Sequence, residues 1–321
     1  MISNTPKNSD KVIVPIAIRP EDITIKNPTK NLRLWNGIMA CLHLGQAIAM
    51  VALSNGFSQK LFWNLPSPIF TGPAGRRPES IPLAIQDWIS IDLGKTVAFF
   101  LFLSALAHLI TILPKVYPWY LAKLESKMNL IRWYEYAISS SVMILIIALL
   151  CGIRDAGILI PLLAINACMN LFGASMEMHN SDLQKFGKLQ EISQITGQNG
   201  LIVQTKTIEQ NSYKPNWSHF IFGCFAGAIP WIVMGVYFYV AFDRLGNIQE
   251  LPQRFKDVLN TVRFVFPILF VFFNCFALNM YLQYKGVGKW KNYLFGEKVY
   301  ILLSLVAKSV LAWFIFGGTL R

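Results

Sequence analysis

Six long stretches of the chain contain no charged residue, and this feature limits most strongly what the chain can fold into. Each stretch is long enough, or nearly so, for a helix to cross the hydrocarbon core of a bilayer, which takes about 20 apolar residues. A seventh stretch, 299–320, contains a single charge, Lys308. With 54% hydrophobic and only 14% charged residues, the chain is not a soluble enzyme, a nucleic-acid module or a disordered protein. The uncharged stretches are 34–59, 96–114, 136–153, 156–176, 215–242 and 264–284.

The sequence therefore predicts an all-α membrane protein built as a bundle of seven transmembrane helices. The predicted helices are 35–56, 88–113, 128–151, 157–180, 217–241, 262–283 and 297–319. A polar, proline-containing tail, 1–34, precedes the seven-helix domain, 35–320. Two long connections, 57–87 and 181–216, interrupt that domain, and both are interpreted as loops.

The first long connection contains two short apolar segments, 61–63 and 69–70, which are expected to pair as a hairpin. Apolar surface outside the bilayer often packs against a neighbouring subunit, so we expect a homodimer surrounded by membrane lipid.

The net charge of +12 is distributed unevenly between the two sides of the predicted bundle. The N-terminal tail and the second, fourth and sixth connections together hold about twice as many Lys and Arg residues as the other connections and the C-terminus. By the positive-inside rule, this asymmetry predicts a cytoplasmic N-terminus and an external C-terminus. The basic excess is thus a topology signal, and no nucleic-acid partner is expected.

Two charged residues lie well inside predicted helices, Lys308 in the seventh and Glu135 in the third. A charge near the bilayer centre costs about 2.5–3.5 kcal/mol, so it is usually paired or functional. The two residues differ in depth by about 6 Å, a gap that two long side chains can close. One interpretation is a purely structural salt bridge between the two helices.

The second interpretation is a retinal site, because the neighbouring residues form two polar stripes. Arg132, Glu135, Tyr136, Ser139 and Met143 share one helical face, and Tyr300, Ser304, Lys308 and Ala312 share another. A lysine in the seventh helix can condense with the aldehyde of retinal. A carboxylate nearby stabilises the resulting positive charge.

Several motifs resemble those of heliorhodopsins. Arg132-Trp133-Tyr134-Glu135-Tyr136 followed by Ser139-Ser140-Ser141 is similar to the third-helix signature of that family. Leu303-Ser304-Leu305-Val306-Ala307-Lys308-Ser309, with Leu311-Ala312-Trp313, is similar to its seventh helix. The resemblance extends over all seven helices, and the family's inverted topology agrees with the charge asymmetry.

The resemblance implies all-trans retinal bound covalently to Lys308, with Glu135 as the counterion. It also implies that Ser104, Ser140, Ser304 and Tyr136 surround the attachment point. A proton-accepting polar cluster is expected from His43, Gln46, His108, Arg132 and Asn166. As further pocket walls we expect Met169, Asn170, Gly173, Trp231, Phe273 and Trp313. No metal site is expected, because the spacing in Glu177-Met178-His179 matches no metal motif.

The absence of relay carboxylates favours a light sensor over an ion pump. Microbial proton pumps of similar layout place a second carboxylate where this chain has Ile146, and an aspartate where it has Ser304. We therefore expect a non-enzymatic photoreceptor of the cell membrane that signals to an unknown cytoplasmic partner. A light-gated proton channel on the same scaffold, and a non-retinal seven-helix transporter or receptor, are the alternatives.

Overall fold

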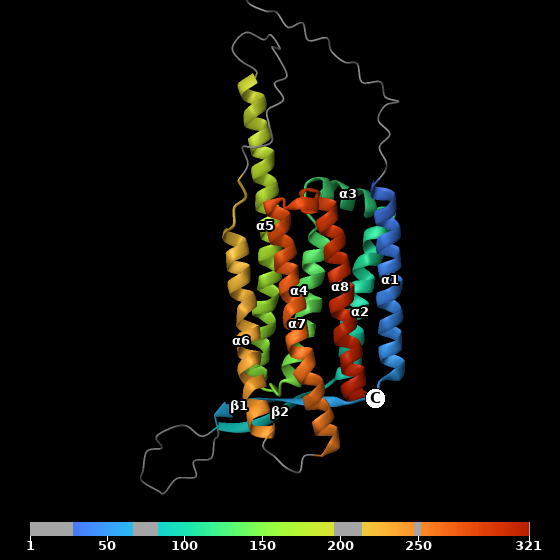
Figure 1. Ribbon diagram of the computed structural model, residues 1–321, viewed down its shortest axis with the longest axis vertical. Coiled ribbons are helices and arrows are strands. Elements are labelled where there is room, and N and C mark those ends of the chain that lie inside the picture. The colour runs from blue at the N-terminus through green and yellow to red at the C-terminus, as the bar shows by residue number, and fades with distance from the viewer. Residues whose placement is uncertain (1–27, 67–82, 196–213, 247–251, 321) are drawn as a thin grey trace, which may run out of the picture.

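The computed structural model describes residues 28–66, 83–195, 214–246 and 252–320. Within this part of the chain, seven helices are long and apolar enough to cross a membrane. They stand side by side as an upright bundle (Figure 1). The predicted seven-helix membrane fold is therefore confirmed. The helices are α1 (Pro28–Leu53), α2 (Leu93–Ile112), α4 (Leu130–Leu150), α5 (Ala156–Ile195), α6 (Ser218–Gly246), α7 (Gln253–Lys285) and α8 (Tyr293–Ile315).

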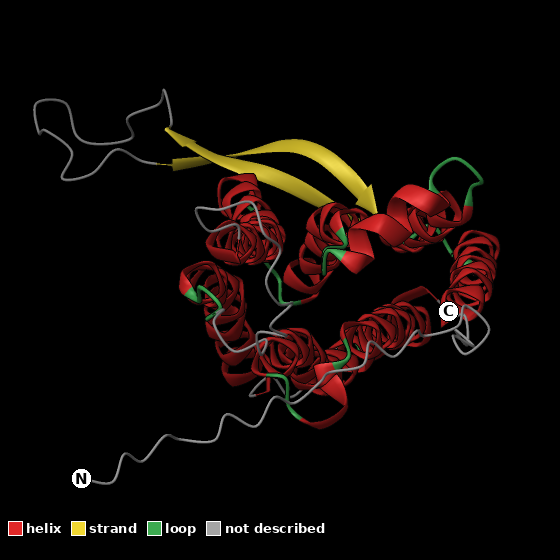
Figure 2. Ribbon diagram, turned by 90° about the horizontal axis from the view of Figure 1, so that it is seen from above, coloured by secondary structure: helices red, strands yellow, loops and turns green. Residues whose placement is uncertain are grey.

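The helices form a closed ring when viewed along the bundle (Figure 2). Helix α1 packs against α2, α2 against α4, α4 against α5, and α5 against α6. On the other side α7 packs against α8, and α8 also contacts α1. Helix α4 stands between α2 and α5 in the ring and also contacts α6 and α7.

Short elements cover the two ends of the bundle. Helix α3 (Tyr117–Glu125) crosses the end at which α1 begins, and the strands β1 (Ser58–Pro66) and β2 (Leu83–Asp92) cross the opposite end (Figure 1). The 3₁₀ helix η2 (Gly288–Lys291) joins α7 to α8, and a π-helical turn, η3 (Phe316–Leu320), follows α8. Gly286 ends α7 in the left-handed conformation, with φ 62°, which suits a residue without Cβ.

The predicted hairpin exists, but its second strand is not the predicted one. β1 contains the predicted segment 61–63, and it pairs antiparallel with β2 from Ser58↔Asp92 to Pro66↔Leu83. The segment 69–70 lies outside the described residues. β1 is anchored to the α4–α5 connection, since Phe62 N donates to Arg154 O at 3.1 Å.

Several predicted helix boundaries differ from the observed ones. Helix α1 begins at Pro28, so residues 28–34 of the predicted tail are helical. Helix α2 begins only at Leu93, because 88–92 belong to β2. Helices α5 and α7 extend beyond their apolar stretches, to Ile195 and from Gln253. The added segment of α5 is rich in helix-forming Leu, Gln and Lys.

The bundle buries small and large apolar side chains at its centre and exposes others on its outside. Val97, Phe100, Ile144 and Leu311 are fully buried where α2, α4 and α8 meet. Many large apolar side chains on the outer surface are exposed, among them Phe225 at 73%. An apolar exterior is what a helix bundle surrounded by lipid requires.

Candidate functional site

Lys308 and Glu135 form a buried ion pair inside the bundle. Lys308 Nζ on α8 lies 2.6 Å from Glu135 Oε1 on α4, and the two side chains are only 4% and 9% exposed. The pairing expected from the sequence is thus present. Both polar stripes also face the interior, because Tyr136, Ser139, Tyr300 and others of their members are buried.

Ser104 on α2 completes the immediate surroundings of the ion pair. Its hydroxyl donates to Glu135 Oε1 at 2.7 Å, and Lys308 Nζ donates to Ser104 Oγ. The ring of Tyr136 lies beside the amine, with its centroid 5.3 Å from Lys308 Nζ. Three helices therefore hold one lysine amine in place, and the Glu135 carboxylate balances its charge.

A second polar group joins α4 to α5. Asn166 Nδ2 and Asn170 Nδ2 donate to Ser140 Oγ at 2.8 and 3.0 Å. Ser140 in turn donates to the carbonyl of Tyr136 at 2.6 Å. The hydrogen bonds of Ser140 thus join it to Asn166 and Asn170 on α5 and to the backbone of α4, and none of them is made with Lys308 or Glu135.

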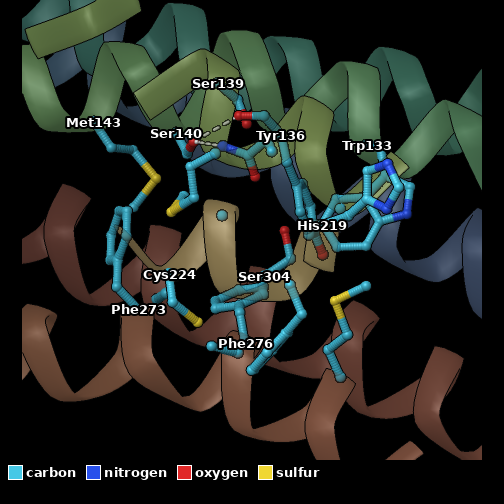
Figure 3. Close-up of a pocket in the computed structure, with 18 of the residues that line it drawn as sticks. Trp133, Tyr136, Ser139, Ser140, Met143, His219, Cys224, Phe273, Phe276 and Ser304 are labelled. Carbon is cyan, nitrogen blue, oxygen red and sulfur yellow. Dashed lines mark hydrogen bonds between the residues drawn. The ribbon is translucent and has the colours of Figure 1, made fainter. Parts of the chain in front are cut away.

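A cavity lined mostly by apolar residues extends from Lys308 between α4, α5, α6, α7 and α8 (Figure 3). The cavity and its mouth together hold about 820 Å³ that protein atoms do not occupy. Among the residues predicted to surround retinal, those that line it are Tyr136, Ser140, Met169, Asn170, Gly173, Phe273, Ser304 and Lys308.

Trp231 and Trp313, both predicted as walls of the retinal pocket, do not line the cavity. Trp231 packs edge-on against Phe273, with ring centroids 5.2 Å apart, so it supports a lining residue from behind. Trp313 is 44% exposed, and its Nε1 donates to Gln46 Oε1 at 3.2 Å. The adjacent Ala312 is the α8 residue that faces the interior, and the 100° turn between neighbours carries Trp313 away from the cavity.

The two predicted histidines lie together. The rings of His43 on α1 and His108 on α2 are stacked, with centroids 5.7 Å apart. His108 Nδ1 lies 2.7 Å from Asn36 Oδ1, whereas neither nitrogen of His43 has a hydrogen-bond partner among the described residues. His108 is one helical turn from Ser104 on the same face of α2, so the histidine pair adjoins the ion pair.

The other three members of the predicted polar cluster do not join the histidines. Gln46 contacts Trp313 near the outside of the bundle, and Asn166 bonds to the serines of α4. Arg132 binds two carboxylates, Glu177 on α5 and Glu297 on α8. The expected single cluster is therefore wrong for these residues, because the rotation of each helix directs them to different neighbours.

The Arg132 cluster is a buried charged site that the sequence analysis did not find. Arg132, Glu177 and Glu297 have side chains no more than 4% exposed. Asn129 supports both carboxylates at 2.8 Å, through its backbone N–H to Glu177 and its side chain to Glu297. Tyr293 donates to Glu177 at 3.2 Å. The sequence did contain a signal for this cluster, because the three charges lie near the ends of predicted helices. Consecutive helices run in opposite directions, so these three ends lie on the same side of the bundle.

The cavity also has a lining residue that was not among those predicted for the site. His219, near the start of α6, forms part of the wall that faces α4 and α7. Asn274 on α7 does not face the cavity, because it is exposed and donates to the carbonyl of Phe270 at 2.7 Å.

The arrangement of a lysine, a carboxylate and an apolar cavity agrees with the comparison with protein families. The family model for heliorhodopsin matches residues 32–320. The chain belongs to the heliorhodopsin family. Heliorhodopsins are retinal-binding, light-sensing membrane proteins, and this chain is accordingly an integral membrane protein of a photoreceptor family. A search of curated proteins finds no match to the chain.

The residues present fit the retinal that this heliorhodopsin's family implies. A primary amine, Lys308 Nζ, stands at the wall of a cavity whose other walls are largely apolar and aromatic. The amine is the reactive group that an aldehyde requires, and the apolar walls suit a hydrocarbon polyene.

Proposed function

We propose that this heliorhodopsin is a light sensor in which all-trans retinal is attached to Lys308 through a Schiff base, with Glu135 as the counterion. The observation that carries the proposal is the buried contact of 2.6 Å between Lys308 Nζ and Glu135 Oε1 beside the cavity. A salt bridge with a purely structural role would not need such a cavity next to it.

Each residue around the attachment point has a distinct task in this proposal. Retinal, when bound, supplies the absorption of visible light and the isomerisation that follows. Glu135 balances the positive charge at Lys308 Nζ, and Ser104 orients the carboxylate through its hydroxyl. Phe273, held by Trp231, forms a rigid wall. The buried position of Lys308, which is 3% exposed, keeps bulk water from the linkage.

The output is proposed to be a signal rather than ion transport. Ile146 and Ser304 occupy the positions of relay carboxylates, and both are buried within the bundle. We further propose an N-terminus in the cytoplasm of a cell-membrane protein, on the strength of the Lys and Arg asymmetry. A partner on that side would then receive the signal at the end of the bundle covered by α3.

The test is the absorption spectrum of purified protein after all-trans retinal is added. We expect a visible band in the parent protein and none in Lys308→Ala, because an imine needs a primary amine. Lys308→Arg is the matched control, since it keeps a positive charge next to Glu135 but offers no amine for condensation. A visible band that persists in both variants would refute the attachment at Lys308, and the absence of a band in the parent would favour a non-retinal role.

A further inference from the structure

The wall of the cavity formed by α6 contains a polar side chain with a nitrogen atom that no described residue satisfies. His219 lines the cavity together with Phe220, Gly223 and Cys224. Its Nδ1 is buried and has no hydrogen-bond partner among the described residues. A buried polar atom of this kind in a binding cavity usually corresponds to a ligand or a water that satisfies it.

The ring of His219 is held in place from the side of α5. Its centroid lies 5.3 Å from that of His179, and His179 Nε2 lies 3.2 Å from Asn216 Nδ2. The ring of His219 therefore packs against the ring of His179, which is itself in contact with Asn216. This packing fixes the orientation in which Nδ1 of His219 has no partner among the described residues.

His219 and Lys308 belong to different walls of the cavity. Lys308 lies on α8, which packs against α7 and α1, whereas α6 packs against α5 (Figure 1). A polyene attached to Lys308 would begin at the α8 wall, and the α6 residues would then line the part of the cavity that receives its ring.

We propose that the cavity accepts a retinal that carries a hydroxyl or ketone oxygen on its ring, and that His219 is the residue that selects it. This inference rests on the proposed function. An unsubstituted hydrocarbon ring offers no hydrogen bond to His219, and a buried polar atom left unpaired against hydrocarbon weakens binding. An oxygen on the retinal ring would form a hydrogen bond with His219 Nδ1 and so remove that cost.

The chemistry of the histidine suits either oxygen function. In one tautomer Nδ1 donates to a ketone or hydroxyl oxygen, and in the other it accepts from a hydroxyl. Trp133, whose indole nitrogen is also buried without a partner among the described residues, lines the same cavity and can only donate. Figure 3 shows Trp133 and His219 on one side of the cavity and Met143 and Phe273 on the other.

The experiment measures equilibrium binding to the retinal-free protein by quenching of tryptophan fluorescence. The probes are all-trans retinol and ring-hydroxylated all-trans retinol, neither of which can form a linkage with Lys308. We expect the hydroxylated alcohol to bind the parent protein about tenfold more tightly, as one recovered buried hydrogen bond predicts. His219→Phe should abolish this preference, and His219→Asn should retain part of it. Phe220→Leu, a change in the same wall without a polar atom, should leave the preference intact.

Equal affinity of the parent protein for the two alcohols would overturn the inference, and so would an unchanged preference in His219→Phe. In either case, a visible band formed with unsubstituted retinal would show that the proposed function stands without this selectivity. If neither alcohol binds and retinal gives no band, both the inference and the proposed function fail.

Discussion

The charge of Glu135 is the residue property that most directly sets the colour of the proposed pigment. At about 4 Å and an effective dielectric constant of about 20, an opposite charge is worth about 4 kcal/mol. In Glu135→Gln the ground state loses more of this stabilisation than the excited state, in which the positive charge is spread over the polyene. We expect the absorption maximum to move to longer wavelength, as measured on purified protein with retinal.

Residues next to the ion pair that carry no negative charge are the controls for this prediction. His43→Gln and His108→Gln should shift the spectrum far less than Glu135→Gln, although the two rings lie beside the site. An unchanged spectrum in Glu135→Gln would mean that another group acts as the counterion.

Gly173 is a residue whose lack of a side chain is required by its neighbour. A Cβ atom at this position would overlap the six-membered ring of Trp133. We expect Gly173→Ala to reduce the free energy of unfolding by about 1–3 kcal/mol, the usual cost of overpacking, and to lower the thermal midpoint in detergent. Gly45→Ala is the control, because a Cβ there meets nothing within 4 Å. Equal midpoints for the two variants would contradict the close approach.

The connection of α4 to α5 and α8 depends on the Arg132 cluster. Arg132→Gln would leave the carboxylates of Glu177 and Glu297 buried without their cation, which typically costs about 3–5 kcal/mol. We expect a large fall in the thermal midpoint, measured with and without retinal. Replacing all three residues by Gln should restore much of the loss, since no buried charge then remains. A triple variant less stable than Arg132→Gln would show that the carboxylates do not depend on Arg132.

The β1–β2 hairpin is the element that we propose for contact with a second copy of the chain. Leu83 and Ile85 on β2 are 66% and 68% exposed in the single chain. Exposed apolar side chains outside the bilayer favour burial against a partner. We expect Leu83→Lys with Ile85→Lys to shift purified protein from dimer to monomer, as measured by light scattering in detergent. Gln86→Lys adds charge at a polar position of the same strand and should leave the dimer intact. A monomeric parent protein would refute the proposed dimer.

At the scale of the whole molecule, the bundle lacks carboxylates at both positions where similar pumps relay protons. Ile146 is fully buried among apolar residues, and Ser304 lies in the cavity wall. We therefore expect no stationary photocurrent in either direction from voltage-clamped cells that contain the pigment. A sustained light-induced current would instead support the proton-channel alternative. In that event, the buried charges around Arg132 would be the first residues to test for a conduction path.

The sequence alone determined the seven helices and the pairing of Lys308 with Glu135. A bilayer requires long apolar helices, so the uncharged stretches located the spans without any knowledge of their packing. A charge in such a span needs a partner, and Lys308 and Glu135, which lie well within their predicted helices, have opposite signs. Helical periodicity then placed Tyr136, Ser304 and Lys308 on interior faces, as the structure shows.

Only the tertiary structure decided which interior residues meet. The partners of Arg132 lie far away in the sequence, on α5 and α8, and the strand opposite β1 begins seventeen residues after β1 ends, as their bounds show. Such contacts depend on which helices are neighbours and on how each is rotated about its axis. A rotation of one residue, about 100°, turned Trp313 outward while Ala312 stayed inside. The same geometry placed His219 in the cavity wall, although it lies near the end of its helix.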